Sequence, residues 1–295
     1  MGTPSVFAVA RDNPAFANVA LIDRNKSVTT HLSRRTGQTF LADLFRDKLP
    51  AIAADVIVAD PPWYVEHMRA FFWAAARLCH VGGHVVASLP PEGTRPHVTD
   101  ELEQIFDWVR EVGLIVEAIE EGALSYETPP FEKNALRASG IHLRSRSWRR
   151  GTLCVLKKVR DSDAARPVVQ SRYDDWCEVD VLGTRIRIRT GTAAVGSADP
   201  RLVSCVPDDV LACVSRRNRL REYIDVWTSG NRVFQCQAPR LLHLIAQYVA
   251  KGIDPAAELT AVADRRSLTA ITYAAKQIID LAITERTERA FIGQG

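Results

Sequence analysis

The chain has 295 residues, of which 46% are hydrophobic and 25% are charged. This length and balance are typical of a folded protein with one or two domains and exclude a disordered or fibrous chain. No stretch approaches the roughly 18 consecutive apolar residues of a membrane-spanning helix, and no secretory signal is visible. The six cysteines are scattered without a C-x-x-C spacing, which argues against a disulfide framework or zinc knuckle. We therefore expect a cytoplasmic protein without a membrane partner.

The charges are distributed unevenly along the chain. The net charge of +3 says little about partners. Between Lys133 and Arg160, however, there are nine basic residues and no acidic one, whereas residues 100–121 hold eight carboxylates and one base. A surface polarised in this way orients an anionic partner.

The first half alternates apolar runs with helix-length segments. Strands are expected at 18–23, 39–43, 54–60, 84–89, 114–119 and 152–159, and helices at 62–79 and 100–112. The pair Gly82-Gly83 is expected to end the first of these helices. Strands separated by helices predict βαβ units and a parallel sheet.

The composition changes near residues 161–167, which predicts one domain over residues 1–162 and another over residues 163–295. The second domain begins with alternating residues that predict a hairpin with one apolar and one basic face. We expect hairpins at 178–189 and 223–236, followed by helices at 239–251, 255–264 and 267–286. This pattern predicts a smaller α+β domain. Helices after a hairpin are compatible with a winged helix, but they favour a packing or dimerisation module.

The motif with the most chemical information is Asp60-Pro61-Pro62-Trp63, directly after the buried strand at 54–60. An amino group on an aromatic ring is a weak nucleophile, because its lone pair is delocalised into the ring. A site that methylates such a group needs an acceptor for the amine hydrogens and a flat surface for the ring. A carboxylate, two prolines that fix the backbone and an aromatic residue supply both.

This tetrapeptide resembles the catalytic motif, D-P-P followed by Tyr, Phe or Trp, of class I S-adenosylmethionine-dependent amino methyltransferases, especially those that modify adenine N6. The resemblance covers about residues 15–160 and implies a Rossmann-like domain. It implies that Asp60 accepts the amine hydrogens, that Pro61 and Pro62 shape the site and that Trp63 stacks on the base. By the same resemblance, the strand-ending Asp23 would bind the cofactor ribose and Asp43 its adenine.

The sequence departs from this family in its N-terminal segment. The glycine-rich loop that holds the methionine end of the cofactor should precede Asp23, but Ser5–Pro14 contains no G-x-G. We therefore expect this chain alone to bind S-adenosylmethionine weakly or not at all.

Basic residues near the predicted site favour a nucleic acid as partner. Substrate contacts are expected from Tyr64 and from basic residues around a tryptophan, namely Arg144, Arg146, Trp148, Arg149 and Arg150. The segment Tyr126–Phe131 is either a substrate loop or a rigid surface turn. No histidine has metal-ligand spacing, so no metal site is predicted.

The leading hypothesis is methyl transfer to an exocyclic amine, with adenine N6 of DNA or RNA as the expected acceptor. One alternative is a catalytically silent nucleic-acid-binding or regulatory subunit, acting with a partner subunit or as a homodimer. The other is an enzyme that methylates a protein or small-molecule amine.

Overall fold

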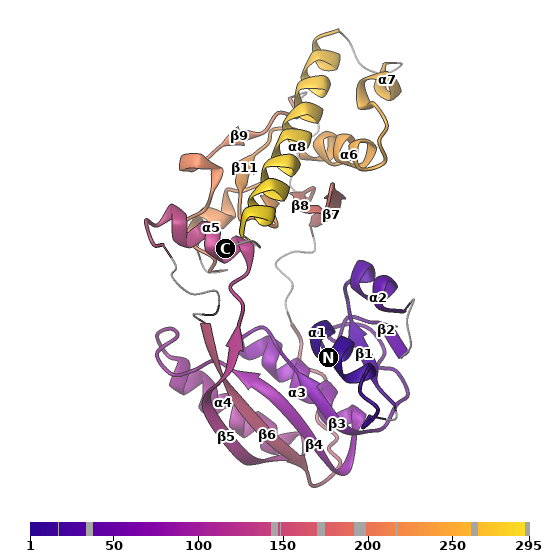
Figure 1. The fold of residues 1–295 in the computed structure, drawn as a ribbon, viewed down its shortest axis with the longest axis vertical. Coiled ribbons are helices and arrows are strands. Elements are labelled where there is room, and N and C mark those ends of the chain that lie inside the picture. Colours follow the sequence, from indigo (N-terminus) through magenta and orange to yellow (C-terminus); the bar gives the residue numbers. More distant parts are fainter. Residues whose placement is uncertain are drawn as a thin grey trace. The chain divides into compact units, whose positions relative to one another are not determined.

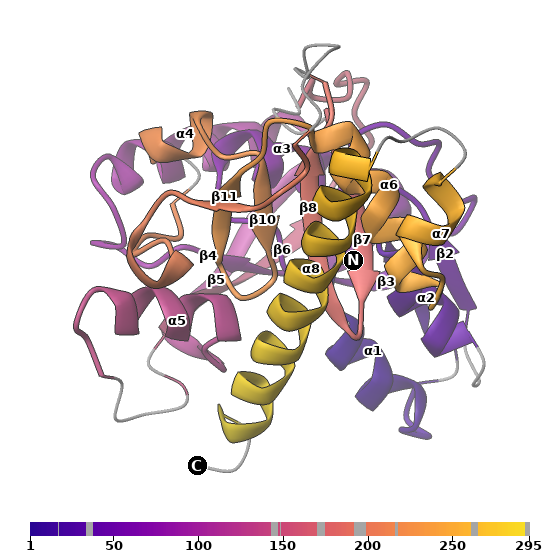
Figure 2. The ribbon, with the colours of Figure 1, turned by 90° about the horizontal axis from the view of Figure 1, so that it is seen from above.

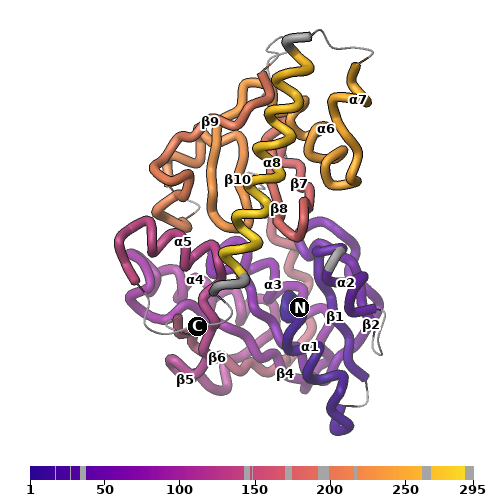
Figure 3. Tube along the Cα trace, turned by 45° about the horizontal axis from the view of Figure 1, so that its top comes forward, coloured from indigo at the N-terminus to yellow at the C-terminus, as the bar shows by residue number. Residues whose placement is uncertain are grey.

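The computed structural model describes residues 1–16, 18–33, 38–142, 147, 149–169, 175–191, 199–215, 218–260 and 265–292. The chain forms two compact units, Met1–Tyr126 with Ser147–Gln170 and Glu127–Arg146 with Ser171–Gly295 (Figure 1). The chain leaves the first unit after Tyr126 and returns to it at Ser147, and the tube in Figure 3 can be followed through both units. In the part of the chain that the structure describes, no helix has the length and apolar character needed to cross a membrane.

The first unit contains six strands in two groups. In the first group, β1 (Ala20–Asp23) and β2 (Gln38–Leu41) pair in parallel. The second group is a four-stranded sheet with the order β3 (Ala54–Ala59), β4 (Cys79–Leu89), β6 (Arg149–Lys158) and β5 (Leu114–Tyr126). Strands β3 and β4 are parallel, and β6 is antiparallel to both of its neighbours. The predicted α/β class is confirmed, but the antiparallel pairing of β6 with β4 and β5 corrects the expectation of a parallel sheet.

Met1 and Gly2 lie between the two groups of strands. The Met1 nitrogen donates to Val58 O at 2.6 Å, and Asp60 N donates to Met1 O at 3.4 Å. On the other side, Gly2 N donates to Ile22 O at 3.2 Å. The order across the layer is therefore β2, β1, Met1–Gly2, β3, β4, β6, β5. The strand order reverses at Met1–Gly2, as in a Rossmann-like layer, and such a reversal is where open α/β sheets bind ligands.

Helices cover one face of the four-stranded sheet. The helices of this unit are α1 (Pro4–Arg11), α2 (Lys26–Ser33), α3 (Val65–Leu78) and α4 (Val98–Glu111). Figure 1 shows α3 and α4 behind the sheet, and their side chains Met68, Phe72 and Ile105 are fully buried with Val85 and Leu156 of the strands. Burial of these apolar side chains holds the helices on the sheet.

The glycines at 82 and 83 have a different role from the predicted one. Helix α3 ends at Leu78 and β4 begins at Cys79, so both glycines lie inside the strand. A Cβ on Gly83 would lie 2.7 Å from both Asp55 O and Cys79 Sγ. The prediction that this pair ends the helix was wrong, because Gly83 instead allows β4 to approach β3 closely.

The second unit contains an antiparallel five-stranded sheet. Its strands, in spatial order, are β7 (Trp176–Val181), β8 (Thr184–Arg189), β10 (Val226–Thr228), β11 (Val233–Gln235) and β9 (Val203–Ser204). Both predicted hairpins are confirmed. The first has the expected two faces, with Ile186 and Ile188 buried and Arg185 exposed. The winged-helix alternative did not predict a five-stranded sheet.

The helices of the second unit are α5 (Pro130–Ala138), α6 (Pro239–Ala250), α7 (Pro255–Leu259) and α8 (Arg265–Ile292), with short 3-10 turns η1 (Pro207–Asp209) and η2 (Arg219–Glu222). Helices α6 and α8 lie on one face of the sheet (Figure 2), and their Leu242, Ile245 and Ile271 share its core. Helix α5 comes from the segment between β5 and β6. Its Asn134 Nδ2 donates to Gly230 O at 2.9 Å, which anchors α5 in this unit.

Candidate functional site

The carboxylate of Asp60 is the centre of a hydrogen-bonded cluster at the carboxyl end of β3. Ser88 Oγ donates to Asp60 Oδ1, and Tyr126 Oη donates to the same oxygen at 3.0 Å. Trp63 Nε1 in turn donates to Ser88 Oγ at 3.3 Å. Within the described ranges, no donor bonds the second carboxylate oxygen, Oδ2. Asp60 is half-buried, and both donors bond its Oδ1. Oδ2 is therefore the carboxylate oxygen that can accept a hydrogen bond from a ligand.

The strand order brings these side chains together from distant parts of the sequence. Asp60 follows the end of β3, and Ser88 lies near the end of the parallel neighbour β4. The antiparallel strand β6 begins at this same edge, where its Arg149 pairs with Tyr126, the last residue of β5. This edge of the sheet therefore carries side chains from β4, β5 and β6 beside Asp60, which follows β3.

Trp63 forms a wall of the cluster. Only 9% of the residue is exposed, and its ring meets that of Tyr126 edge-on, with centroids 5.7 Å apart. The Arg149 guanidinium carbon lies 4.5 Å from the Trp63 ring centroid. A Cβ on Gly151 would lie 2.8 Å from Tyr126 Cε2 and 3.1 Å from Trp63 Cζ2. The glycine is therefore required for the two rings to pack on β6.

The phenol of Tyr126 stays protonated at neutral pH. Burial raises the pKa of Tyr126 to about 12, and the charge of Asp60 together with its hydrogen bond acts in the same direction. The adjacent Ser88 hydroxyl and the nearby Arg149 lower the pKa of Tyr126, but by less than burial raises it. Tyr126 is therefore a hydrogen-bond donor to Asp60 rather than a phenolate.

The two acids predicted to bind the cofactor lie at the reversal of strand order. Asp23 ends β1, and its Oδ1 accepts a hydrogen bond from Asn25 N at 2.8 Å. Asp43 follows β2, and its Oδ1 accepts from Phe45 N at 3.0 Å. The structure thus brings Asp23, Asp43 and Asp60 to the carboxyl ends of three strands of one layer.

The other predicted site residues have different environments. Pro61 is buried and Pro62 half-buried. Tyr64 precedes α3 as its N-cap, with the Arg95 guanidinium carbon 6.0 Å from its ring centroid, so it belongs to the wall around α3. Arg150 is exposed on β6 beside Arg149. Arg144, Arg146 and Trp148 lie outside the described residues.

Ser88 and Gly151 were missed as functional residues, and Tyr126 was identified only as part of a loop or turn. The structure places Tyr126 in β5 and Pro130 at the start of α5, so only residues 127–129 connect the two elements. A signal for Ser88 was present, because Ser88-Leu89-Pro90 puts a polar residue and a proline at a strand end, as Asp60-Pro61 does.

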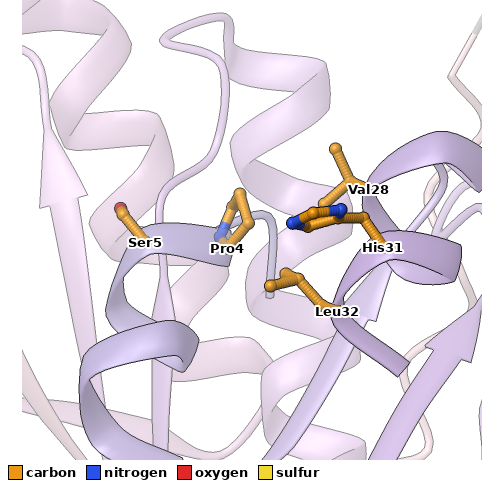
Figure 4. A pocket seen from close by; sticks show the side chains of 5 residues that line it. All are labelled: Pro4, Ser5, Val28, His31 and Leu32. Carbon is orange, nitrogen blue, oxygen red and sulfur yellow. The ribbon is translucent and has the colours of Figure 1, made fainter. Parts of the chain in front are cut away.

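A separate open cavity of about 570 Å³ lies between α1 and α2 (Figure 4). Pro4 and Ser5 line it from the start of α1, and Val28, His31 and Leu32 line it from α2. Its lining is mostly apolar, and none of these residues belongs to the Asp60 cluster.

Comparisons with known proteins give only distant similarities. No family model and no curated protein matches the sequence. The chain is similar to the C9 mutein of a branched-chain polyamine synthase from Thermus thermophilus in complex with N4-aminopropylspermidine and 5'-methylthioadenosine, at 19% identity and a TM-score of 0.44, over 54% of this chain and 49% of that one. The chain spans about half the length of the polyamine synthase structures.

Two methyltransferase structures are also similar. One is the N-methyltransferase NodS from Bradyrhizobium japonicum in complex with S-adenosyl-L-homocysteine, at 12% identity and a TM-score of 0.31, over 48% of this chain and 67% of that one. The other is the 16S rRNA methyltransferase KamB, at 17% identity and a TM-score of 0.36, over 54% and 83% of the two chains. Similarity at this level identifies neither a family nor a substrate for this chain.

Proposed function

We propose that this protein transfers a methyl group from S-adenosylmethionine to an exocyclic amine, and that the acceptor is adenine N6 in DNA or RNA. The observation that carries this proposal is the Asp60 carboxylate at the carboxyl end of β3, held through Oδ1 by Ser88 and Tyr126. Oδ2 is left to accept a hydrogen bond from the amine. This arrangement supports the role that the D-P-P-W resemblance implies for Asp60.

The residues at the reversal of strand order fit a nucleoside cofactor. A ribose presents hydroxyl donors, and the carboxylates of Asp23 and Asp43 are acceptors held in place by backbone N–H groups. Gly2, at the reversal of strand order, has φ +66°, a backbone conformation that favours glycine. Asp23 and Asp43 would hold the cofactor, which supplies an electrophilic methyl group when bound.

The chemistry of this chain in the transfer is positioning and charge stabilisation. Asp60 Oδ2 would accept one amine hydrogen, which directs the nitrogen lone pair toward the methyl group. As the nitrogen gains its bond to the methyl carbon it would become positively charged, and the adjacent carboxylate would stabilise that charge until the nitrogen releases one hydrogen as a proton to solvent. Alignment of the nitrogen with the methyl group accounts for the rest of the rate increase.

In this proposal the base lies beside Trp63 and does not contact the face of its ring. The ring of Trp63 is 91% buried, and Arg149 already covers it. Guanidinium planes stack on bases as aromatic rings do. We therefore propose Arg149 as the surface that the base contacts, with Arg150 contacting the phosphate backbone. The predicted stacking of Trp63 on the base stays a prediction.

The test is transfer of tritiated methyl groups from S-adenosylmethionine to adenine-containing single-stranded oligonucleotides. Asp60→Asn keeps the shape of the side chain and removes its charge, so we expect the rate to fall about 100-fold or more. Asp55→Asn is the matched control, because Asp55 lies on the same strand with its side chain 94% exposed. Unchanged transfer in Asp60→Asn would contradict the proposal. Transfer to a protein or a small amine instead of the oligonucleotide would contradict its nucleic-acid part.

A further inference from the structure

We infer that Ser88 and Tyr126 are positioning residues, which hold the Asp60 carboxylate so that Oδ2 faces the substrate amine. The inference rests on the proposed function and adds two residues that the motif does not contain. Both hydroxyls donate to Oδ1, and neither donates to Oδ2. A carboxylate held by two donors on one oxygen cannot rotate without losing both hydrogen bonds. The direction of the second oxygen is therefore fixed before a substrate binds.

Ser88 connects the two ends of the motif. It is 3% exposed, and its hydroxyl accepts from Trp63 Nε1 at 3.3 Å while it donates to Asp60. A serine hydroxyl has one hydrogen to donate. Because Trp63 has only a donor to offer, the Ser88 hydrogen is directed to Asp60. Trp63 thus orients Ser88, and Ser88 orients Asp60.

Tyr126 fixes the carboxylate from the opposite strand. Its Oη lies 3.0 Å from Asp60 Oδ1, and its ring is clamped between Trp63 and the backbone at Gly151. The phenol remains a donor throughout the pH range in which most proteins are folded, since its pKa is about 12. Ser88 and Tyr126 come from β4 and β5, so the direction of Asp60 depends on two strands besides its own.

The hydroxyls could instead serve only to satisfy a half-buried carboxylate, and the two roles have different consequences. A purely structural role predicts loss of stability with unchanged turnover for each folded molecule. A positioning role predicts reduced turnover with unchanged cofactor affinity, because Asp23 and Asp43 lie on other strands. It also predicts that the three groups influence one another's ionisation in the absence of any substrate.

The first arm of the experiment measures this ionisation directly. Difluorotyrosine at position 126, which ionises at lower pH than tyrosine, is titrated by fluorine NMR in the full chain. Asp60→Asn removes a negative charge and an acceptor, so we expect the pKa of the phenol to fall. Ser88→Ala removes a donor from Asp60 Oδ1, which leaves more negative charge on the oxygen that faces the phenol, so the pKa of the phenol should rise. A pKa that neither change moves would overturn the inference and leave the proposed function intact.

The second arm measures methyl transfer to the adenine oligonucleotide. We expect Ser88→Ala and Tyr126→Phe each to lower kcat about tenfold, with an unchanged Kd for S-adenosylmethionine, and the double variant to lose more than either. Ser88→Thr, which keeps the hydroxyl, should recover most of kcat. Ser125→Ala and Tyr223→Phe are the matched controls, because both residues are exposed.

The outcomes separate the two proposals. An unchanged kcat in folded Ser88→Ala and Tyr126→Phe would overturn the positioning role. A wild-type protein that transfers no methyl group, but shows both changes in the phenol pKa, would overturn the proposed function and with it the catalytic meaning of the cluster.

Discussion

Each unit stacks an arginine on a tryptophan, but the two kinds of stack connect to different groups. In the first unit, the Arg149 guanidinium carbon lies 4.5 Å from the Trp63 ring centroid. In the second unit, that of Arg221 lies 3.9 Å from the Trp227 centroid, and that of Arg189 lies 4.9 Å from the Trp176 centroid. Stacks of this kind are common in nucleic-acid interfaces, so the stacks alone would make both units candidates.

The arginines of the second unit are bonded to backbone carbonyls. Arg221 donates to Ser215 O at 2.8 Å and to Val214 O at 3.2 Å. Arg189 donates to Glu222 O and to Arg221 O, both at 2.8 Å. These bonds, with the stack of Arg221 on Trp227, hold residues 213–215 and 221–222 next to the sheet. The Arg–Trp stacks of the second unit therefore stabilise a loop.

The Arg149–Trp63 stack of the first unit adjoins an ionisable group. Trp63 donates to Ser88, and Ser88 donates to the half-buried Asp60. An Arg–Trp stack that only stabilises the fold needs no neighbouring carboxylate with an oxygen that accepts no hydrogen bond. The comparison shows that an Arg–Trp pair becomes evidence for a site only through the groups that it positions.

The largest expected effect is on stability in the first unit. Trp63→Ala removes a ring that is 91% buried, so we expect the free energy of unfolding to fall by about 3–5 kcal/mol. Trp227→Ala should cost less, because Trp227 is only half-buried. Denaturant titration of both variants provides the measurement. A loss below about 1 kcal/mol for Trp63→Ala would mean that the ring is not part of the core.

The next effect concerns the loop held by Arg221. Arg221→Ala leaves several carbonyls without their donor, and we expect a loss of about 2–3 kcal/mol. The same change should raise the reactivity of the half-buried Cys213 toward a thiol reagent, because the Arg221 side chain bonds the Cys213 backbone. Arg219→Ala, an exposed arginine of the same turn, is the control. Equal reactivity of Cys213 in Arg221→Ala and Arg219→Ala would contradict a role for Arg221 in holding this loop.

The comparison also shows which parts of the site were predictable from sequence. Asp23, Asp43 and Asp60 follow short apolar runs, and this local pattern correctly located three strand ends. Ser88 and Tyr126 reach Asp60 only through the order β3, β4, β6, β5, whose pairing has irregularities in β5 that no local pattern encodes. The burial of Trp63 likewise depends on Gly151, which is far away in the sequence.

The membership of residues 127–146 in the second unit had no local signal either. Helix α5 has an ordinary helical sequence between two strands of the first unit. What assigns it to the second unit is the packing of side chains such as Asn134, which bonds Gly230 in a distant turn. Contacts between residues so far apart in the sequence are determined by the complete fold.

The smallest expected effect is on the salt dependence of nucleic-acid binding, and it tests which Arg–Trp region contacts phosphate. Binding that neutralises phosphates weakens with salt at a log–log slope of about −0.7 to −0.9 per contact, so four contacts from the basic run between Lys133 and Arg160 give about −3. Replacing Arg149 and Arg150 with alanine should reduce the slope by about one to two. The control replaces Arg185 and Arg187 of β8 with alanine. Arg187 already forms an ion pair with Glu178 and stacks on Trp227.

Fluorescence anisotropy of a labelled single strand at several salt concentrations measures all three proteins. We expect the β8 double variant to keep the wild-type slope, because Arg187 is already paired with Glu178 and stacked on Trp227. If instead the β8 variant loses slope and the Arg149/Arg150 variant keeps it, phosphate contacts belong to the second unit, and Arg149 acts on Trp63 alone. A slope near zero in the wild type would remove the nucleic acid as partner. It would leave Asp60 as the site for an uncharged amine substrate, since the Asp60 cluster itself needs no phosphate.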